Sequence, residues 1–364
     1  MKNTRIQKIG TIARATLQTL GYRFRKQLYY VAPEANWSID WDAHYITNGV
    51  SEQFDLKAQV VSDPRWLVGQ IVHYGSLWAF LGNLKGSQLR NNTNVVTVFH
   101  GNPDDKRLGF SEPFQKLMNH QASIHRLVVS NRIMAERFLG LGFAEERIVR
   151  VPLGVDLSIF RPGTMEERSA LRQRLGIPED AFCIGSFHKD GDGWEEGNSP
   201  KLVKGPDVLL KTIDKLRKKH NVHVLLTAPA RGYVTKGLEE MGVSYTHRLV
   251  ERYQDLASYY HALDAYVVPS REEGGPKGVL EALASGVPLV STKVGLAPDI
   301  IEDGKNGLLS ESEDASGLAK NLALVKEHPE KAERIAKAGL ESIKPYDWMK
   351  IASMYYQKVY EGLR

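Results

Sequence analysis

The sequence predicts an α/β protein made of two doubly wound, Rossmann-like domains, each built on a parallel sheet. The chain has 364 residues, more than one typical domain needs. Short apolar, β-branched runs alternate with helical patterns from Gln27 to the end, and the alternation restarts after a segment rich in proline and glycine around Pro162. Ligands of such sheets bind outside the carboxyl ends of the strands, so two facing domains are expected to enclose a central cleft.

The strand candidates follow one another at the spacing of repeated β–α units. In the first half we predict strands over residues 28–31, 58–61, 70–73, 95–99, 125–129 and 148–151. In the second half we predict strands over 182–186, 223–227, 265–268 and 288–291, with weaker ones near Val243 and Leu308. Helical patterns lie between them over 130–141, 166–175, 205–220, 253–263 and 312–326.

Three segments follow from this pattern. We predict an N-terminal Rossmann-like domain over residues 1–160 and a C-terminal Rossmann-like domain over 161–343. A final helix is predicted over 344–364, and it carries the aromatic residues Trp348, Tyr355, Tyr356 and Tyr360. Such a helix is expected to pack back on the N-terminal domain.

The net charge of +5 is concentrated at the N-terminus. Seven basic residues precede the first acidic one, Glu34: Lys2, Arg5, Lys8, Arg14, Arg23, Arg25 and Lys26. Apolar residues recur at helical spacing in the same stretch, which predicts a basic amphipathic helix. This helix either adheres to an anionic membrane surface or packs on its own domain, and the sequence leaves both open. A nucleic-acid partner is not expected, because no interleaving of aromatic and basic residues follows.

Cys183 is the only cysteine, so neither an intrachain disulfide nor a thiolate metal cluster is expected. The sequence shows no apolar run of about 18 residues and no signal-peptide pattern. We therefore expect a cytoplasmic protein, associated peripherally with the cytoplasmic membrane face if the basic helix binds lipid.

Residues 266–290 are the most informative segment. An apolar strand pattern runs into a glycine-containing turn, and the turn opens a short helix. Free backbone N–H groups and the positive end of the helix dipole suit a phosphate there. Glu273 and Glu281 would repel that phosphate, so their carboxylates are better suited to sugar hydroxyls. The segment predicts a ligand that carries both phosphate and sugar.

Several motifs over residues 148–310 together resemble retaining nucleotide-sugar glycosyltransferases of the GT-B fold, of the glycosyltransferase family 4 type (glycosyl transferases group 1). The motifs are VRVPLGVDLSIFRP, Lys204-Gly205-Pro206-Asp207, the YYHALD segment before the strand at 265–268, Glu273-Gly274-Gly275-Pro276 with Glu281-Ala282, and Gly304-Lys305-Asn306-Gly307-Leu308. The resemblance implies transfer of a sugar from a nucleotide diphosphate donor to a hydroxyl of a glycan, a glycolipid or a similar acceptor, with retention of configuration. It places the donor on the C-terminal domain and the acceptor on the N-terminal domain.

The resemblance also implies roles for single residues. Glu273 contacts the donor sugar near the reacting carbon, and Glu281 holds the ribose. Backbone groups of the turn meet the diphosphate, over Gly274, Gly275, Pro276, Lys277 and Gly278. Lys204 offsets the charge of the leaving group. The family arginine that usually follows the glycine of the preceding strand is missing after Gly185, and we predict that Lys189 replaces it, with Lys201 as the alternative.

Two aspartates in the same loop, Asp190 and Asp192, match a D-x-D pair that can bind Mg²⁺ or Mn²⁺. Since lysines and a helix terminus already face the leaving diphosphate, we interpret them as turn residues. We predict no metal and no cofactor, with the nucleotide sugar acting as co-substrate.

In the N-terminal half, His100 follows a predicted strand, and the resemblance places a histidine there near the reacting carbon. His73, at another strand end, is predicted on the acceptor side, as are Asn36 and Ser38 in the loop after the first strand. Same-face attack is the expected mechanism, with Glu273 as a covalent nucleophile the alternative. Alternative functions are a non-catalytic nucleotide-sugar-binding protein and a sugar phosphorylase or epimerase of the same fold.

Overall fold

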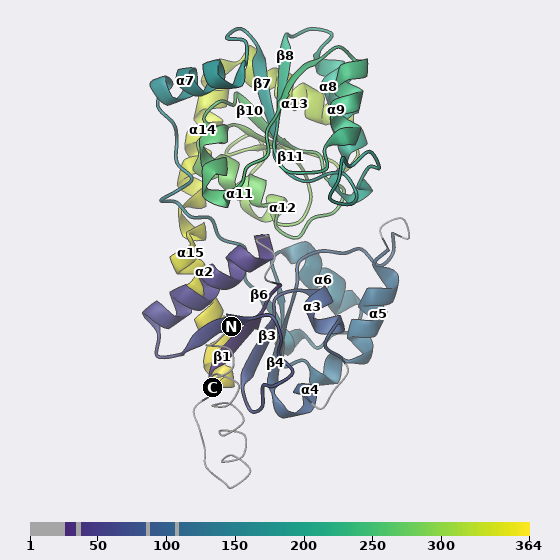
Figure 1. Cartoon of the computed structure of the whole chain (residues 1–364), viewed down its shortest axis with the longest axis vertical. Helices are drawn as coiled ribbons and strands as arrows, with labels where there is room; N and C mark the ends of the chain where they lie inside the picture. The colour runs from purple at the N-terminus through teal and green to yellow at the C-terminus, as the bar shows by residue number, and fades with distance from the viewer. Residues whose placement is uncertain (1–25, 34–37, 85–87, 106–108) are drawn as a thin grey trace. The chain divides into compact units, whose positions relative to one another are not determined.

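The computed structural model describes residues 26–33, 38–84, 88–105 and 109–364 (Figure 1). The chain divides into unit 1, which comprises Met1–Gly154 and Trp348–Arg364, and unit 2, which comprises Val155–Asp347. Each unit contains a six-stranded sheet, and this confirms the predicted α/β fold with two parallel sheets. The basic stretch over residues 1–25 lies outside the described residues.

The sheet of unit 1 has the strand order β2-β1-β3-β4-β5-β6, and all neighbouring strands are parallel. Its strands are β1 (Leu28–Val31), β2 (Ala58–Val61), β3 (Ile71–Tyr74), β4 (Thr93–Val98), β5 (Arg126–Val129) and β6 (Ile148–Arg150). Its main helices are α2 (Ser38–Gln53), α3 (Leu77–Leu81), α4 (Gln88–Asn91), α5 (Ser111–Asn119), α6 (Arg132–Gly140) and α15 (Trp348–Tyr355). Figure 1 shows α2 and α15 on one face of this sheet and α3, α5 and α6 on the other.

The C-terminal segment belongs to unit 1 because aromatic rings join it to α2. The rings of Tyr45 and Trp348 stack with centroids 5.1 Å apart, and those of Phe54 and Tyr356 stack at 3.9 Å. Gly49 allows this close approach, since a Cβ there would lie 2.5 Å from the Cβ of Ala352. The chain therefore crosses from unit 1 to unit 2 and returns.

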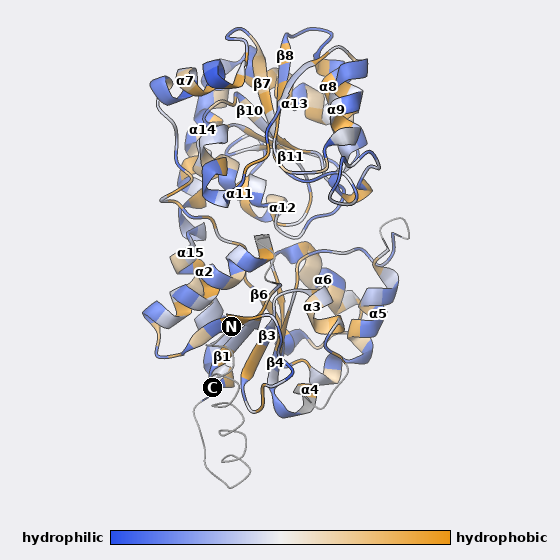
Figure 2. Cartoon of the chain, viewed as in Figure 1, coloured by the Kyte–Doolittle hydropathy of each residue, from blue (hydrophilic) through white to orange (hydrophobic). Residues whose placement is uncertain are grey.

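Unit 2 has the strand order β12-β11-β10-β7-β8-β9, again with every neighbour parallel. Its strands are β7 (Phe182–Ser186), β8 (Val222–Leu226), β9 (Ser244–His247), β10 (Ala265–Val268), β11 (Leu289–Thr292) and β12 (Leu308–Ser310). Its main helices are α7 (Met165–Leu175), α8 (Pro206–Leu216), α9 (Gly232–Glu240), α10 (Leu256–Tyr260), α11 (Lys277–Ala284), α12 (Ala297–Ile300), α13 (Ala315–Glu327) and α14 (Pro329–Ile343). Figure 2 shows apolar residues along the strands, which are buried between helices.

The boundary between the units lies at 154/155, six residues before the predicted one. The reason is that the segment after Gly154 packs on unit 2. The N–H of Val155 donates to the carbonyl of Tyr346 at 2.9 Å. Phe160 is buried, and its ring lies 5.6 Å from that of Tyr253 and 5.9 Å from that of Tyr260.

Candidate active site

The predicted donor residues lie where the strand order of unit 2 changes direction. β7 and β10 are neighbours in the sheet, but the chain continues from them toward opposite edges. In a doubly wound sheet the carboxyl ends of two such strands flank the crevice in which ligands bind. His188 and Lys189 follow β7, and Glu273 follows β10 just before α11. The topology thus places the predicted residues at the edge where doubly wound sheets bind their ligands.

Glu273 is held by a lysine and a serine. The Lys204 Nζ donates to both carboxylate oxygens of Glu273 at 2.7 Å, and the Ser270 Oγ donates to Oε1 at 2.9 Å. Glu273 is buried, so the ammonium is a close and poorly screened counter-charge. Gly205 makes the approach possible, because a Cβ there would lie 2.1 Å from the carbonyl oxygen of Pro269. Its φ of +65° also favours glycine.

Three lysines gather at this edge. Burial lowers the pKa of Lys201, and the nearby charges of Lys204 and Lys189 lower it further. The Lys189 ammonium also lies 4.0 Å from the centre of the Trp194 ring. Lys201 therefore lies close enough to both Lys204 and Lys189 to link the three lysines electrostatically. Lys201 also lies within electrostatic range of Glu273, which pairs with Lys204. The three ammonium groups form a positive cluster that attracts an anion.

A buried ion pair fixes the loop that carries Lys189, and the sequence analysis did not predict this ion pair. The Arg231 Nε lies 2.9 Å from Asp190 Oδ1, and both side chains are 0% exposed. The Arg231 Nη1 also donates to the carbonyls of Ser186 and His188, at 2.6 and 2.8 Å. The interpretation of Asp190 as a turn residue is wrong, because its carboxylate is buried against a guanidinium. Burial raises the pKa of Asp190.

Within the described ranges, no three His, Cys, Asp or Glu side chains gather so that they could hold a metal ion. Asp192 remains at the loop surface, where its backbone N–H donates to the Ser199 carbonyl at 2.9 Å.

Glu281 lies on α11 and is 3% exposed. Two tyrosines donate to its carboxylate: Tyr253 to Oε1 at 2.5 Å and Tyr260 to Oε2 at 2.8 Å. Tyr266 extends this group, since its hydroxyl accepts the N–H of Phe187 at 3.2 Å. The sequence pattern identified the segment that contains Tyr260 but not these hydrogen bonds.

The glycine turn adjoins the same group. α11 begins at Lys277, directly after Pro276, which carries no side-chain cap. A Cβ at Gly278 would lie 2.4 Å from the hydroxyl oxygen of Tyr266, so only glycine fits without a shift. The carbonyls of Glu273 and Gly274 press against Gly295, where a Cβ would lie 2.7 and 2.5 Å from them. The backbone of the turn is fixed by packing from two sides.

The histidines of unit 1 differ from each other. His73 is 0% exposed, its Nδ1 lies 2.6 Å from the Tyr360 hydroxyl, and its Nε2 lies 2.7 Å from Thr97 Oγ1. Burial lowers its pKa to about 3. The predicted acceptor-side role of His73 does not hold, because both ring nitrogens are engaged in the core. His100 is half-buried after β4, with its ring edge-on to Phe110 at 5.4 Å.

The two other acceptor-side predictions stay predictions. Asn36 lies outside the described residues, and Ser38 is the first residue of α2.

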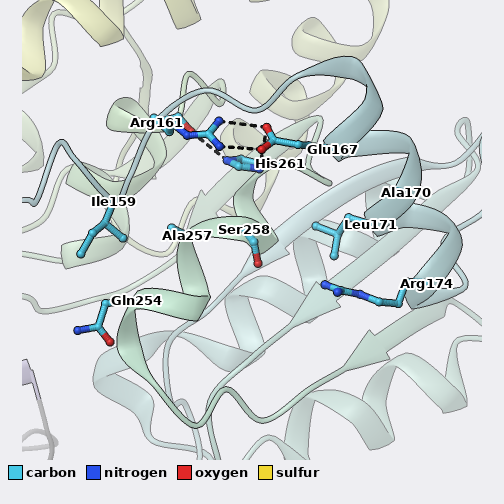
Figure 3. A pocket seen from close by; sticks show the side chains of 10 residues that line it. All are labelled: Ile159, Arg161, Glu167, Ala170, Leu171, Arg174, Gln254, Ala257, Ser258 and His261. Atoms are coloured by element: carbon cyan, nitrogen blue, oxygen red, sulfur yellow. Dashed lines mark hydrogen bonds and ion pairs between the residues drawn. The ribbon is translucent and has the colours of Figure 1, made fainter.

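A cavity of about 450 Å³ lies elsewhere in unit 2 (Figure 3). It is lined by Ile159, Arg161, Glu167, Ala170, Leu171, Arg174, Gln254, Ala257, Ser258 and His261. Arg161 and Glu167 form an ion pair of 2.7 Å at its rim. None of the predicted donor residues lines this cavity, which instead borders the segment that carries Tyr253 and Tyr260.

Known proteins share parts of this sequence. Residues 200–342 match the family model described as glycosyl transferases group 1. The D-inositol 3-phosphate glycosyltransferase of Xylanimonas cellulosilytica is 32% identical over 243 residues, which cover 64% of this chain and 56% of that protein. The enzyme of the same name from Saccharomonospora viridis is 32% identical over 242 residues, which cover 62% of this chain and 53% of that protein. The chain thus matches little more than half the length of these relatives.

Solved structures share the fold over most of the chain. Anabaena HepE, crystallised with UDP and glucose, has a TM-score of 0.73 at 16% identity, covering 93% of this chain and 99% of that one. Sucrose-phosphate synthase from Thermosynechococcus elongatus has a TM-score of 0.72 at 18% identity, with the same coverage. At these identities the likeness concerns the fold. No helix in the described part of the chain is both long and apolar enough to cross a membrane.

Proposed function

We propose that this chain, which matches the glycosyl transferases group 1 model over residues 200–342 and has the GT-B fold, transfers a sugar from a nucleotide diphosphate donor to an acceptor hydroxyl. The observation that carries this proposal is the pairing of Glu273 with Lys204 inside the cluster of three lysines. The cluster offers positive charge to the diphosphate. The carboxylate beside it suits the hydroxyls of the sugar.

The chemistry of the proposed transfer follows from this arrangement. Cleavage of the bond between the sugar and the phosphate leaves negative charge on the leaving oxygen, and the ammonium of Lys204 stabilises that charge. Lys189 and Lys201 add to the same field and stand in for the arginine that follows the strand glycine in members of the family. These fixed charges supply the stabilisation for which other glycosyltransferases use a metal, and we propose that transfer is metal-independent.

We further propose same-face attack with retention of configuration. A covalent nucleophile needs a free carboxylate oxygen, whereas both oxygens of Glu273 accept hydrogen bonds from Lys204. This pairing lowers the nucleophilicity of the carboxylate and favours a role in orienting the sugar. In that mechanism the leaving phosphate oxygen accepts the proton of the acceptor hydroxyl. A glycosyl adduct of Glu273 trapped in mass spectra would overturn it.

The acceptor is proposed to be a hydroxyl of a glycan or a lipid-linked glycan, and His100 to lie near it. The basic N-terminal stretch is proposed to hold the protein on an anionic membrane surface. Deletion of residues 1–26 is expected to abolish co-sedimentation with anionic liposomes. Unchanged co-sedimentation would remove the membrane proposal and leave the transfer proposal intact.

A ligand screen followed by a transfer assay tests the function. UDP-, GDP-, ADP- and dTDP-sugars are screened by thermal shift, because a ligand that binds the folded state raises its melting temperature. UDP-sugars come first, since HepE was crystallised with UDP and glucose. Release of nucleotide diphosphate that depends on added acceptor, and its loss in Lys204→Met, are the expected results. Lys218→Met is the matched control, because Lys218 is exposed on the surface. Failure of every donor to bind would refute the proposal.

A further inference from the structure

The carboxylate of Glu281 is buried, and both of its oxygens accept hydrogen bonds from tyrosines. Tyr253 and Tyr260 each donate one hydrogen bond, and each takes a different oxygen. A buried carboxylate without such donors would be strongly destabilising. The two hydroxyls therefore hold the buried carboxylate in one orientation.

The two tyrosines are held very differently. Tyr260 is 0% exposed, and its ring packs against Phe187 at 4.8 Å and Tyr266 at 5.2 Å. Tyr253 is half-buried and lies in a 3₁₀ helix of one turn, Tyr253–Asp255. Its ring lies 5.1 Å from the ammonium of Lys277, the first residue of α11. Tyr253 thus lies beside the helix terminus to which we assign the donor, whereas Tyr260 belongs to the core.

The 3₁₀ turn that carries Tyr253 borders a cavity. The next residue, Gln254, lines the cavity of about 450 Å³ together with Ile159 and Ser258 (Figure 3). Side chains in a close-packed core have little room to move, whereas a residue next to a cavity can shift at low cost. Tyr253 packs on the ring of Phe160 at 5.6 Å but is only half-buried, whereas Tyr260 is fully buried and has less freedom to move.

We propose that the Tyr253 hydroxyl is a placeholder for a ribose hydroxyl of the donor nucleotide. In the empty protein it occupies Oε1 of Glu281. When the nucleotide binds, a ribose hydroxyl takes this position and Tyr253 moves away. Tyr260 keeps its hydrogen bond to Oε2 in both states and orients the carboxylate. This inference rests on the proposed function, in which Glu281 binds the ribose. Tyr253 and Tyr260 are positioning residues and take no part in the chemical step.

Two matched substitutions on one carboxylate then have opposite effects. Tyr253→Phe removes a competitor from the empty state only, so nucleotide diphosphate should bind about tenfold more tightly, the change expected for one lost charge-assisted hydrogen bond. Tyr260→Phe removes the group that orients Glu281 in the bound state, so binding should weaken several-fold. A purely structural role would weaken binding in both variants.

A modified ligand separates competition from other causes. The dissociation constant is measured by calorimetry on the full chain, for the nucleoside diphosphate selected by the screen and for its 2′,3′-dideoxy analogue. With the dideoxy analogue no hydroxyl replaces that of Tyr253, so the gain in Tyr253→Phe should disappear. Circular dichroism and melting temperature establish that both variants are folded. Should Tyr253→Phe lose stability, Tyr253→Leu provides a second test with the same expected sign.

The outcomes distinguish the two proposals. If the unmodified protein binds a nucleotide diphosphate and Tyr253→Phe leaves the affinity unchanged or lowers it, the placeholder inference is wrong and the proposed function stands. A gain that persists with the dideoxy analogue also overturns the inference. If the unmodified protein binds none of the nucleotide diphosphates, the proposed function fails and the inference fails with it.

Discussion

Unit 1 should lose stability in mild acid because of one buried histidine. His73 lies on β3, with its ring nitrogens bonded to Thr97 on β4 and to Tyr360 in the C-terminal segment. The imidazole is fully buried, and burial lowers its pKa from about 6.5 to about 3. The folded protein therefore keeps His73 neutral at a pH at which the unfolded chain binds a proton.

The size of the effect follows from the pKa difference. Above the unfolded pKa of about 6.5, His73 is neutral in both states and costs the folded protein no stability. As the pH falls from there toward the folded pKa of about 3, the unfolded chain binds a proton that the folded protein does not, and the free energy of unfolding decreases. Each pKa unit corresponds to about 1.4 kcal/mol, so the loss at pH 5 is about 2 kcal/mol. This is a large share of the stability of a typical domain.

Tryptophan fluorescence can follow unit 1 separately. Trp194 is the one tryptophan of the six that falls in unit 2, so Trp194→Phe provides a parent whose signal comes from unit 1. Urea unfolding of this parent at pH 7 and pH 5 is compared with the same protein carrying His73→Gln. The parent should lose about 2 kcal/mol more than the variant over this range. His188→Gln, in unit 2, is the control and should leave the transition of unit 1 unchanged. Equal losses in the parent and in His73→Gln would refute the reasoning.

Three further outcomes are expected. Arg231→Met should destabilise unit 2 by about 3–5 kcal/mol in urea unfolding, because it leaves the buried carboxylate of Asp190 unpaired, and Asp190→Leu in the same chain should restore part of the loss. Gly278→Ala should lower the melting temperature, because its Cβ would meet Tyr266, whereas Gly140→Ala, with nothing within 4 Å, should not. Excess EDTA should leave the transfer rate unchanged, and a loss restored by Mg²⁺ or Mn²⁺ would contradict metal independence.

The strands were predictable where both faces of the sheet are buried. β1, β7 and β10 have the predicted bounds, because a buried parallel strand is a continuous apolar run that polar residues terminate. β3 begins and ends one residue later than predicted, since His73 lies inside the strand. A histidine at the end of an apolar run is typical of a ligand site as well as of a core. Its partner Tyr360 is 287 positions away, so the sequence pattern could not decide between them.

The residues of the site that belong to sequence motifs were predictable, whereas their partners from distant segments were not. The motif spacing identified Glu273 and Lys204, which the fold brings into contact across 69 positions. It did not identify Arg231, because an arginine after a predicted strand is usually exposed and nothing in the local pattern links it to Asp190. The hydrogen bonds from Tyr253 and Tyr260 to Glu281 could not be predicted for another reason. An aromatic residue at helical spacing indicates burial, whereas the direction of its hydroxyl depends on segments that are distant in the sequence.

Under the proposed function, the two glutamates of the donor motif respond differently to the same ligand. Glu273 is paired with a full positive charge, and a diphosphate that approaches the lysine cluster competes for that charge. Glu281 is paired with neutral hydroxyls, and the ribose offers it another neutral hydroxyl. Replacement of the tyrosine hydroxyl by a ribose hydroxyl therefore changes the free energy of the hydrogen bond to Glu281 little, and it serves to recognise the ribose. The exchange at Glu273 changes the local charge next to the bond that breaks, so the electrostatic consequence of donor binding is concentrated at the reacting end of the donor.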